Sequence, residues 1–389
     1  CDAAAVSEPA LLHELVVAGL DDVVAAAEGR RPSRTATARP LPPAPHSRRL
    51  TALDAGFLRL ESADTPMHIG AVFVLDGDPL RDDRGELRLG EITRHVDARV
   101  RRVPQLTRRI AEVPLGLGRP VWVDDESFDI GHHLFVTTVG APGDRVAFLD
   151  RCAELLREPL DRSRPLWQLC LVEGLADGRV GVVEKLHHAL VDGIGGVDIA
   201  AALFDVEPDS GVDTPVRRRV SPAPSSTRLL AAAVVGQLTD PARTAGRLVA
   251  AAWRAPDAVA ARVGSVAGAA RDLARPGART QRAAFNRQVG PDRIVRTVEI
   301  GLDEVRAIGA PVGATVNDVV LAAVTGGVVA WMDEHGEHPA ELHAVVPVSV
   351  RNREDRTLGN HVGAVLVALP VGEPDPLRRL HLVETHMRR

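Results

Sequence analysis

The sequence lacks tyrosine altogether and contains a single lysine, Lys185, so arginine supplies almost all of its positive charge. We interpret this bias as a consequence of nucleotide composition rather than of function. Cysteine is also scarce, because only Cys1, Cys152 and Cys170 are present and their spacing is not that of a zinc site. These shortages argue against a disulfide framework and structural zinc, and they favour a reducing compartment.

No apolar run is long enough to suggest a transmembrane span. The longest nearly apolar stretch, Val319 to Met332, has 14 residues, whereas a transmembrane helix needs about 20. The chain has 389 residues, of which 45% are hydrophobic and 25% charged. This composition and length predict a folded protein with two domains or one large bilobal domain.

The pattern of apolar residues divides the chain into four parts. Residues 1–46 form an N-terminal extension that ends in a Pro- and Arg-rich linker, and we expect it to be partly disordered. Residues 47–206 and 291–389 alternate between strand-like and helix-like periods, which is typical of an α/β fold. Residues 207–290 predict a helical connector between these two lobes. The expected strands are 69–75, 180–186, 294–300, 342–350 and 362–369, and the expected helices are 92–103, 147–156, 303–308, 316–332 and 376–386.

Positive charge is concentrated in the connector. Between positions 217 and 296 the sequence has 15 arginines and four acidic residues, although the whole chain carries a net charge of −5. Asp240 and Pro241 predict the start of a helix on which Arg243, Arg247 and Arg254 share one face. This face favours an anionic lipid surface as a partner, and a solvated linker is the alternative.

The sharpest local signal is the pair His187-His188, followed by Asp192-Gly193, at the end of the predicted strand 180–186. Adjacent residues of a strand point to opposite sides, so only one histidine can face a cleft. An imidazole there can accept a proton near neutral pH, while Asp192 and Gly193 can fix the following turn. A packed structural pair is the alternative interpretation, and a metal site lacks a third ligand.

This stretch resembles the H-H-x-x-x-D-G motif of the CoA-dependent acyltransferase superfamily, and its flanks narrow the resemblance. Five ordered motifs resemble those of the bacterial wax ester synthase/diacylglycerol acyltransferase family. They are residues 53–57 with 65–70, Pro165-Leu166-Trp167 with 171–175, the histidine motif, Asn317-Asp318 within 313–319, and 346–351 with 359–360. The resemblance runs from about Leu50 to the end without the connector. A later segment typical of the family is missing, so we expect the second lobe to be incomplete.

The resemblance implies an α/β fold of two chloramphenicol acetyltransferase-like lobes with mixed sheets. It implies an O-acyltransferase that moves a long-chain acyl group from acyl-CoA, as co-substrate, to a fatty alcohol or diacylglycerol. We expect no bound cofactor, no metal and no nucleic-acid partner, and a cytoplasmic enzyme peripherally associated with a membrane or lipid body. The alternatives are a relative that makes other apolar esters or uses a carrier-bound acyl donor, and a non-catalytic lipid-binding relative.

The resemblance also assigns roles to individual residues. His188, which matches the second histidine of the motif, is the expected general base, and His187 either assists its geometry or is structural. Asp192 is expected to make a structural ion pair, with Arg351 as a candidate partner. The remaining expected roles are a substrate-facing wall formed by Pro165, Leu166 and Trp167, and either helix capping or shaping of the site by Asn317 and Asp318.

Overall fold

The structure is a computed structural model, and it describes residues 47–191, 196, 199–200, 202–204, 220–235, 283–285, 289–338, 341–349 and 362–388. The N-terminal extension and most of the connector lie outside these residues. The predicted basic face of Arg243, Arg247 and Arg254 is therefore also outside them. The described part of the connector contains the helix Ser226–Val235.

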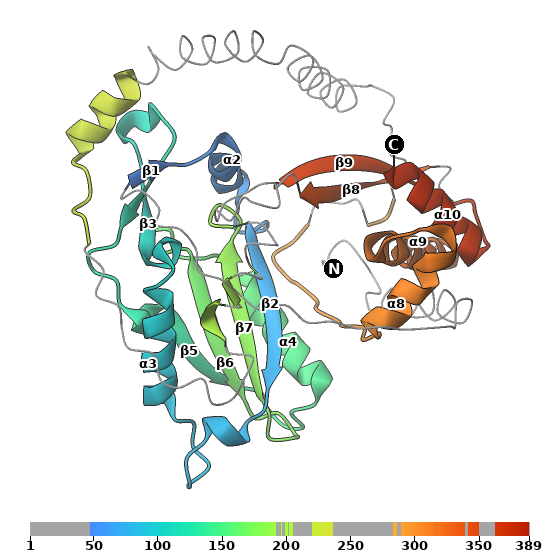
Figure 1. Cartoon of the computed structure of the whole chain (residues 1–389), viewed down its shortest axis with the longest axis horizontal. Helices are drawn as coiled ribbons and strands as arrows, with labels where there is room; N and C mark the ends of the chain where they lie inside the picture. Colours follow the sequence, from blue (N-terminus) through green and yellow to red (C-terminus); the bar gives the residue numbers. More distant parts are fainter. Residues whose placement is uncertain are drawn as a thin grey trace.

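The main sheet has four strands in the order β2–β7–β6–β5 (Figure 1). Its central strand, β7, pairs antiparallel with β2 and β6, whereas β6 pairs parallel with β5, so the sheet is mixed. Every residue of β7 is buried. The strands are β2, His68–Leu75; β5, Leu134–Thr138; β6, Trp167–Glu173; and β7, Val180–His187.

Two helices enclose this sheet, because its strands carry apolar side chains on both faces. Val96 of α3 joins the same apolar core as Val182, and Phe148 of α4 packs with Val183 on the other side. Gly181 permits this second contact, since a Cβ there would lie 2.2 Å from the Phe148 ring. The helices are α3, Leu89–Val100, and α4, Arg145–Arg157.

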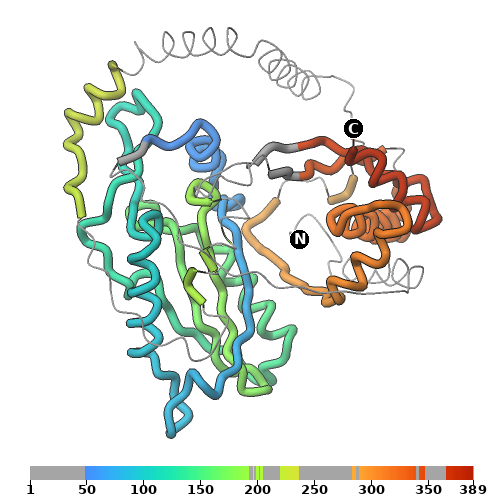
Figure 2. The backbone as a smooth tube through the Cα atoms, in the orientation of Figure 1, coloured from blue at the N-terminus to red at the C-terminus, as the bar shows by residue number. Residues whose placement is uncertain are grey.

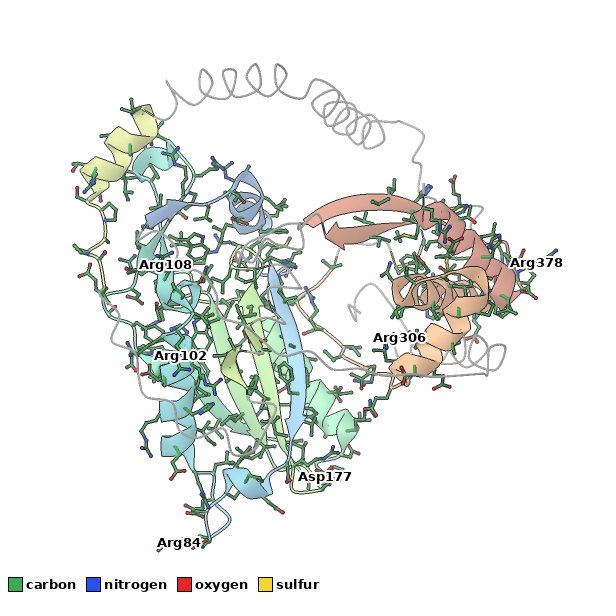
Figure 3. All side chains as sticks on the ribbon, in the orientation of Figure 1. Arg84, Arg102, Arg108, Asp177, Arg306 and Arg378 are labelled. Carbon is green, nitrogen blue, oxygen red and sulfur yellow. The ribbon has the colours of Figure 1, made fainter. Side chains whose placement is uncertain are left out.

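A smaller antiparallel sheet, in the order β1–β4–β3, lies beside the main one. Arg108 and Asp124 form an ion pair at 3.0 Å between its strands, with only 3% of each side chain exposed (Figure 3). Asp124 also accepts a hydrogen bond from the backbone N–H of Ser221, which fastens the connector to this sheet. The elements are β1, Ser47–Arg49; α2, Ala52–Leu60; β3, Arg108–Ala111; and β4, Val121–Asp124. The short 3-10 helices are η1, Asp78–Leu80; η2, Pro104–Thr107; η3, Pro114–Gly116; η4, Ile130–His132; and η5, Ala310–Val312.

The C-terminal elements are three helices and an antiparallel strand pair. They are α8, Leu302–Gly309; α9, Val316–Glu334; β8, Leu342–Ser349; β9, Val362–Leu369; and α10, Pro376–Met387. Val319 of α9 packs with Ile308 of α8 and Leu380 of α10 in one apolar cluster. By length and composition alone α9 could cross a membrane, with a mean hydropathy of 1.3, but 44% of that window is buried inside the protein. The face of α9 that carries Val319 and Ala322 packs in this cluster.

An extended segment, 289–301, connects the two groups of elements (Figure 2). The strand predicted at 294–300 is wrong, because these residues are extended but pair with no described strand. Their arginines instead bind the first lobe: Arg293 donates to the Asp64 carbonyl at 2.7 Å, and Arg296 pairs with Asp150 at 2.8 Å. An apolar pattern with a period of two predicts an extended backbone, whereas a sheet also needs a neighbouring strand to pair with.

The other predicted strands and helices are confirmed, β9 with the predicted bounds and the rest with shifted ends. β2 begins one residue before the predicted strand, α3 spans 89–100 rather than 92–103, and α9 continues two residues beyond 332. Such shifts are ordinary for element boundaries.

Candidate active site

The two motif histidines lie where β7 ends and a turn begins. His187 is the last strand residue, paired with His68 of β2, and His188 is the first residue of the turn. The backbone N–H of His188 donates to the Met67 carbonyl at 2.8 Å, and the N–H of Leu190 donates to the His187 carbonyl at 2.8 Å. Backbone hydrogen bonds on both sides therefore fix where the His188 side chain leaves the sheet.

His187 is completely buried, and both nitrogens of its ring face groups of the protein. Its Nδ1 accepts the backbone N–H of Ala189 at 2.9 Å, which leaves the ring proton on Nε2 in the neutral form. Nε2 lies 3.4 Å from Oε1 of Glu61. The His187 ring thus links the turn to α2, as expected for the histidine that faces away from the site.

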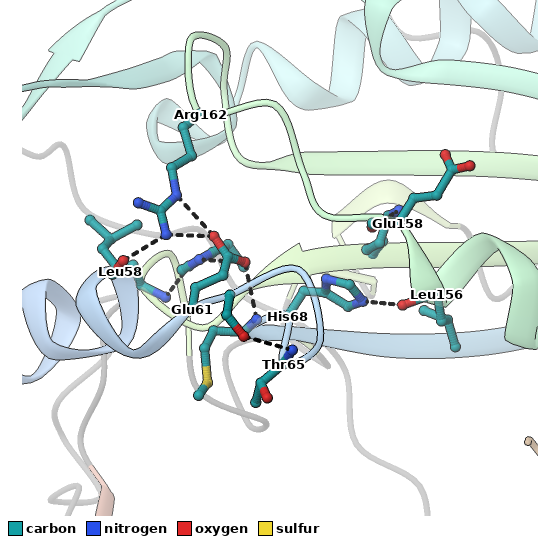
Figure 4. A network of polar contacts seen from close by, with 12 residues as sticks. Leu58, Glu61, Thr65, His68, Leu156, Glu158 and Arg162 are labelled. Atoms are coloured by element: carbon teal, nitrogen blue, oxygen red, sulfur yellow. Dashed lines mark hydrogen bonds and ion pairs between the residues drawn. The ribbon is translucent and has the colours of Figure 1, made fainter. Parts of the chain in front are cut away.

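Glu61, at the C-terminal end of α2, collects several donors around one carboxylate (Figure 4). Arg162 donates to Oε2 through Nε at 2.9 Å and Nη2 at 2.7 Å, and the Met67 N–H donates to Oε1 at 3.0 Å. Burial alone would raise the pKa of Glu61, but the nearby His187 ring and the hydrogen bonds from Met67 and Arg162 outweigh it and lower that pKa to about 2. The carboxylate is ionised at neutral pH and holds three chain segments together.

The C-terminal end of α4 contacts the same strands on the face that carries His187, because Lys185 lies two residues before it and His68 pairs with it across the strands. His68 Nε2 lies 2.7 Å from the Leu156 carbonyl, and Lys185 Nζ donates to the carbonyls of Leu155 and Glu158 at 2.9 Å each. These carbonyls have no partner within the helix itself, so the two side chains cap it. Burial lowers the pKa of His68 to about 4 and also lowers that of Lys185. Both residues fix β2 and β7 against α4.

His188 is the motif histidine that the fold leaves half-buried at this edge. Its ring stacks on Phe57 of α2, with centroids 4.8 Å apart and an interplanar angle of 19°. Phe57 therefore restricts the orientation of the His188 ring. A positioned imidazole of this kind is suited to general base chemistry.

The Pro165-Leu166-Trp167 stretch lies in the protein core next to the motif. Leu166 and Trp167 are at most 1% exposed, and the Trp167 Nε1–H donates to the Leu106 carbonyl at 2.7 Å. The Leu166 carbonyl accepts the backbone N–H of His187 at 3.0 Å. The structure therefore gives this stretch a role in positioning the histidine strand, while contact with substrate stays a prediction.

The second histidine pair of the sequence, His132-His133, has a structural explanation. His133 stacks between Phe128 and Trp167, at 5.3 and 4.6 Å between ring centroids, and its Nδ1 lies 2.9 Å from the Trp167 carbonyl. Burial lowers the pKa of His133. His132 is exposed and makes none of these contacts.

Asn317 and Asp318 lie at the start of α9, which Figure 1 draws well apart from the end of β7. Asp318 is 4% exposed and forms a capping box with Thr315, whose N–H and hydroxyl both donate to Oδ2 at 2.7 Å. The capping role is thus confirmed for Asp318, with Thr315 as the N-cap residue. Asn317 is exposed. Asp192, Gly193 and Arg351 lie outside the described residues, so their expected ion pair and turn stay predictions.

Sequence reasoning missed Glu61, Arg162 and the capping role of His68. Glu61 lies only seven residues before His68, and Arg162 three before Pro165, so both flank matched motifs. Nothing in their spacing indicates that they meet. Among the described residues, no three His, Cys, Asp or Glu side chains are grouped so as to hold a metal ion.

Comparison with known proteins agrees with this arrangement of motifs. The model of the wax ester synthase/diacylglycerol acyltransferase catalytic domain matches residues 50–320. The chain is 32% identical over 339 residues to "Putative diacyglycerol O-acyltransferase MT1809" of Mycobacterium tuberculosis, covering 86% of this chain and 65% of that protein. It is 30% identical over 345 residues to "Probable diacyglycerol O-acyltransferase tgs1" of the same species, covering 87% and 70%. The chain thus spans about two thirds of the length of these relatives.

The fold is shared with solved structures, among them these two. The wax ester synthase/diacylglycerol acyltransferase from Marinobacter aquaeolei VT8 matches with a TM-score of 0.58 at 23% identity, covering 88% of this chain and 72% of that one. The first condensation domain of the calcium-dependent antibiotic synthetase matches with a TM-score of 0.54 at 18% identity, covering 88% and 74%. The mixed α/β architecture is therefore the one that condensation domains also adopt. From the family match over residues 50–320, the chain belongs to the wax ester synthase/diacylglycerol acyltransferase family.

Proposed function

We propose that this chain is part of an O-acyltransferase that moves a long-chain acyl group from acyl-CoA to diacylglycerol or a fatty alcohol. The observation that carries the proposal is that the two histidines of the pair have different contacts. His187 is committed to Ala189 and Glu61, whereas His188 stays half-buried at the strand end with its ring oriented by Phe57. In a family of acyltransferases, this arrangement supports His188 as the reacting base.

The proposed reaction is a direct transfer. The acceptor hydroxyl oxygen attacks the thioester carbonyl while His188 takes its proton, a C–O bond forms, and the C–S bond breaks to release CoA, which receives a proton. An alkanol with a pKa of about 16 cannot be ionised fully by imidazole, so proton removal accompanies attack and contributes about 10² to 10⁴ in rate. Positioning of the two substrates supplies the remainder.

Apolar substrates of this kind partition into lipid, so we place the enzyme at a membrane or lipid-body surface on the cytoplasmic side. Acyl-CoA is then the water-soluble co-substrate and the ester product stays in the lipid phase. The chain needs no bound cofactor in this scheme.

The test is His188→Ala in the full-length protein, with palmitoyl-CoA as donor and dioleoylglycerol or hexadecanol as acceptor. We expect turnover to fall by about 10² or more while the melting temperature stays within about 2 °C. His132→Ala is the matched control, because His132 is exposed and should leave turnover unchanged. Equal rates for wild type and His188→Ala would rule out the mechanism. A requirement for a carrier-bound donor would favour condensation-type chemistry instead.

A further inference from the structure

The extended segment 289–301, which we call the strap, runs along α4 in the opposite direction. Three ion pairs fix it there, and the partner on α4 moves towards the start of the helix as the strap advances. They are Asp292–Arg157 at 2.9 Å, Arg296–Asp150 at 2.8 Å and Glu299–Arg145 at 2.9 Å. The strap therefore first contacts α4 at its C-terminal end, the same end that His68 and Lys185 cap.

Arg293 of the strap binds a different segment, the loop between α2 and β2. Its Nη2 donates to the Asp64 carbonyl at 2.7 Å, across 229 positions of sequence. Its Nη1 donates to the strap itself, to the carbonyls of Gly290 at 2.7 Å and Asp292 at 3.0 Å. A guanidinium presents its donors in one rigid plane. The Arg293 side chain therefore holds the backbone of the strap and the backbone of the loop at a fixed separation.

Asp64 lies at the exposed tip of this loop, within a closed turn. The N–H of Thr65 donates to the Ser62 carbonyl at 3.2 Å, and the N–H of Ser62 donates to the Thr65 carbonyl at the same distance. Ser62 Oγ also accepts the Thr65 N–H, at 3.1 Å, and Figure 4 shows Thr65 beside Glu61 and His68. Because these bonds close the turn, a contact at Asp64 holds the turn as a whole.

Met67, at the end of the loop, makes the backbone contact of the proposed base. Its carbonyl accepts the N–H of His188 at 2.8 Å, and its own N–H donates to Glu61 Oε1 at 3.0 Å. Only Pro66 lies between the turn and Met67, and the ring of a proline fixes its φ. A movement of the turn is therefore passed on to the Met67 carbonyl and to His188.

We propose that Arg293 is a positioning residue for the acyl transfer, because it holds the 62–65 turn and, through Met67, sets where His188 leaves the sheet. The inference rests on the proposed function, since it takes His188 as the reacting base. A general base acts only within hydrogen-bond reach of its proton, and a misplacement of about 1 Å can cost about 10²-fold in rate. The geometry of a residue in the first lobe thus depends on an arginine that follows the connector.

The first test is hydrogen–deuterium exchange of the full-length protein, followed by mass spectrometry. In Arg293→Ala, the His188 N–H should exchange about tenfold faster, because the loop that carries its acceptor opens more often. Peptides within 180–186 should be unchanged, since β7 keeps both neighbouring strands. Arg296→Ala is the matched control on the same strap, because its partner Asp150 lies on α4 rather than in the loop.

The second test is the rate of acyl transfer from palmitoyl-CoA to dioleoylglycerol. Arg293→Ala should lower kcat about tenfold and leave KM for both substrates within about twofold, because the base is displaced while no substrate contact is removed. Arg293→Lys should recover most of the rate, since an ammonium group can still donate to the Asp64 carbonyl. Arg296→Ala should keep the wild-type kcat.

Unchanged exchange at His188 in Arg293→Ala would overturn the inference. Equal acceleration in Arg296→Ala, or acceleration throughout 180–186, would also overturn it, because the strap would then act on general stability. Faster exchange with an unchanged kcat would exclude the positioning role. Exchange is measured without substrate, so it does not depend on the chemistry of His188. If exchange rises but His188→Ala keeps full turnover, the proposed function fails while the hold of Arg293 on His188 stands.

Discussion

Glu61 and Glu184 are both almost completely buried beside the same sheet, yet their surroundings differ completely. The Glu61 carboxylate receives hydrogen bonds from Arg162 and from the Met67 N–H, and it lies 3.4 Å from His187 Nε2. Glu184 is 1% exposed in the middle of β7, between Ala71 and Leu169 of the neighbouring strands. Its Oε1 has no hydrogen-bond partner among the described residues.

The pKa values follow from these surroundings. Burial raises the pKa of Glu184 from 4.5 to about 7, whereas donors lower that of Glu61 to about 2. Burial disfavours the charged carboxylate in both places, and only at Glu61 do donors outweigh this effect. The difference teaches that burial alone does not decide the charge of a carboxyl group. The Glu61 carboxylate stays charged because donors from separate chain segments surround it.

The largest effect is expected when the Glu61 network is broken. Glu61→Gln should lower the free energy of unfolding at pH 7 by about 2 to 3 kcal/mol, because the charged bonds from Arg162 are lost. Turnover should fall as well, since His187 and the Met67 loop position His188. Urea unfolding and the acyl-transfer assay measure the two effects. Glu173→Gln, which breaks the more exposed ion pair with Arg81 at 2.8 Å, is the control and should cost at most about 1 kcal/mol.

The same substitution at Glu184 should raise stability at high pH, whereas Glu61→Gln lowers it. Its pKa is raised in the folded protein, so its contribution to stability is present below pH 4.5 and is lost as the pH rises towards 7 and above. Glu184→Gln should therefore match wild type near pH 4.5 and be more stable by about 2 kcal/mol at pH 8.5. Thermal or urea unfolding across this range measures the difference. Glu86→Gln, an exposed site, should show no such crossover, and a wild type more stable than Glu184→Gln at pH 8.5 would contradict the comparison.

A smaller effect is expected at His68. Its folded pKa of about 4 lies below the ordinary 6.5, so the neutral ring contributes stability above pH 6.5 that is lost as the pH falls towards 4. His68→Gln can still donate to the Leu156 carbonyl but cannot gain a proton. The free energy of unfolding that is lost between pH 6.5 and 4 should therefore be smaller in the variant than in wild type, by about 1 kcal/mol. An equal loss of stability on acidification in wild type and variant would show that other groups control this loss.

Much of the fold was accessible from the sequence because periodicity reports local structure. The alternation of 69–75 and 180–186 predicted the strands that became β2 and β7, and the apolar run ending at Met332 predicted α9. The histidine motif and its flanking motifs indicated the family, which the comparisons show. The segment 294–300 failed because an extended pattern does not reveal whether a partner strand is present.

The site was predicted less completely than the fold. The motif that predicts His188 is contiguous in sequence, whereas Glu61 and Arg162 are 101 residues apart and meet only after folding. The ring of Trp167 lies against His133 and its N–H is bonded to the Leu106 carbonyl, and neither contact follows from the local sequence. Its contact with substrate stays a prediction. Such long-range partners carry no local signal.

The sequence by itself determined the periodic elements, the scarcity of cysteine and lysine, and the order of motifs that identifies the family, because each is written in neighbouring residues. Only the tertiary structure decided which histidine is buried and which glutamate is charged. Those outcomes depend on donors and apolar surfaces brought together from distant segments. The free energy of a side chain is set by the atoms that surround it in the folded chain, and sequence neighbours supply only a few of them.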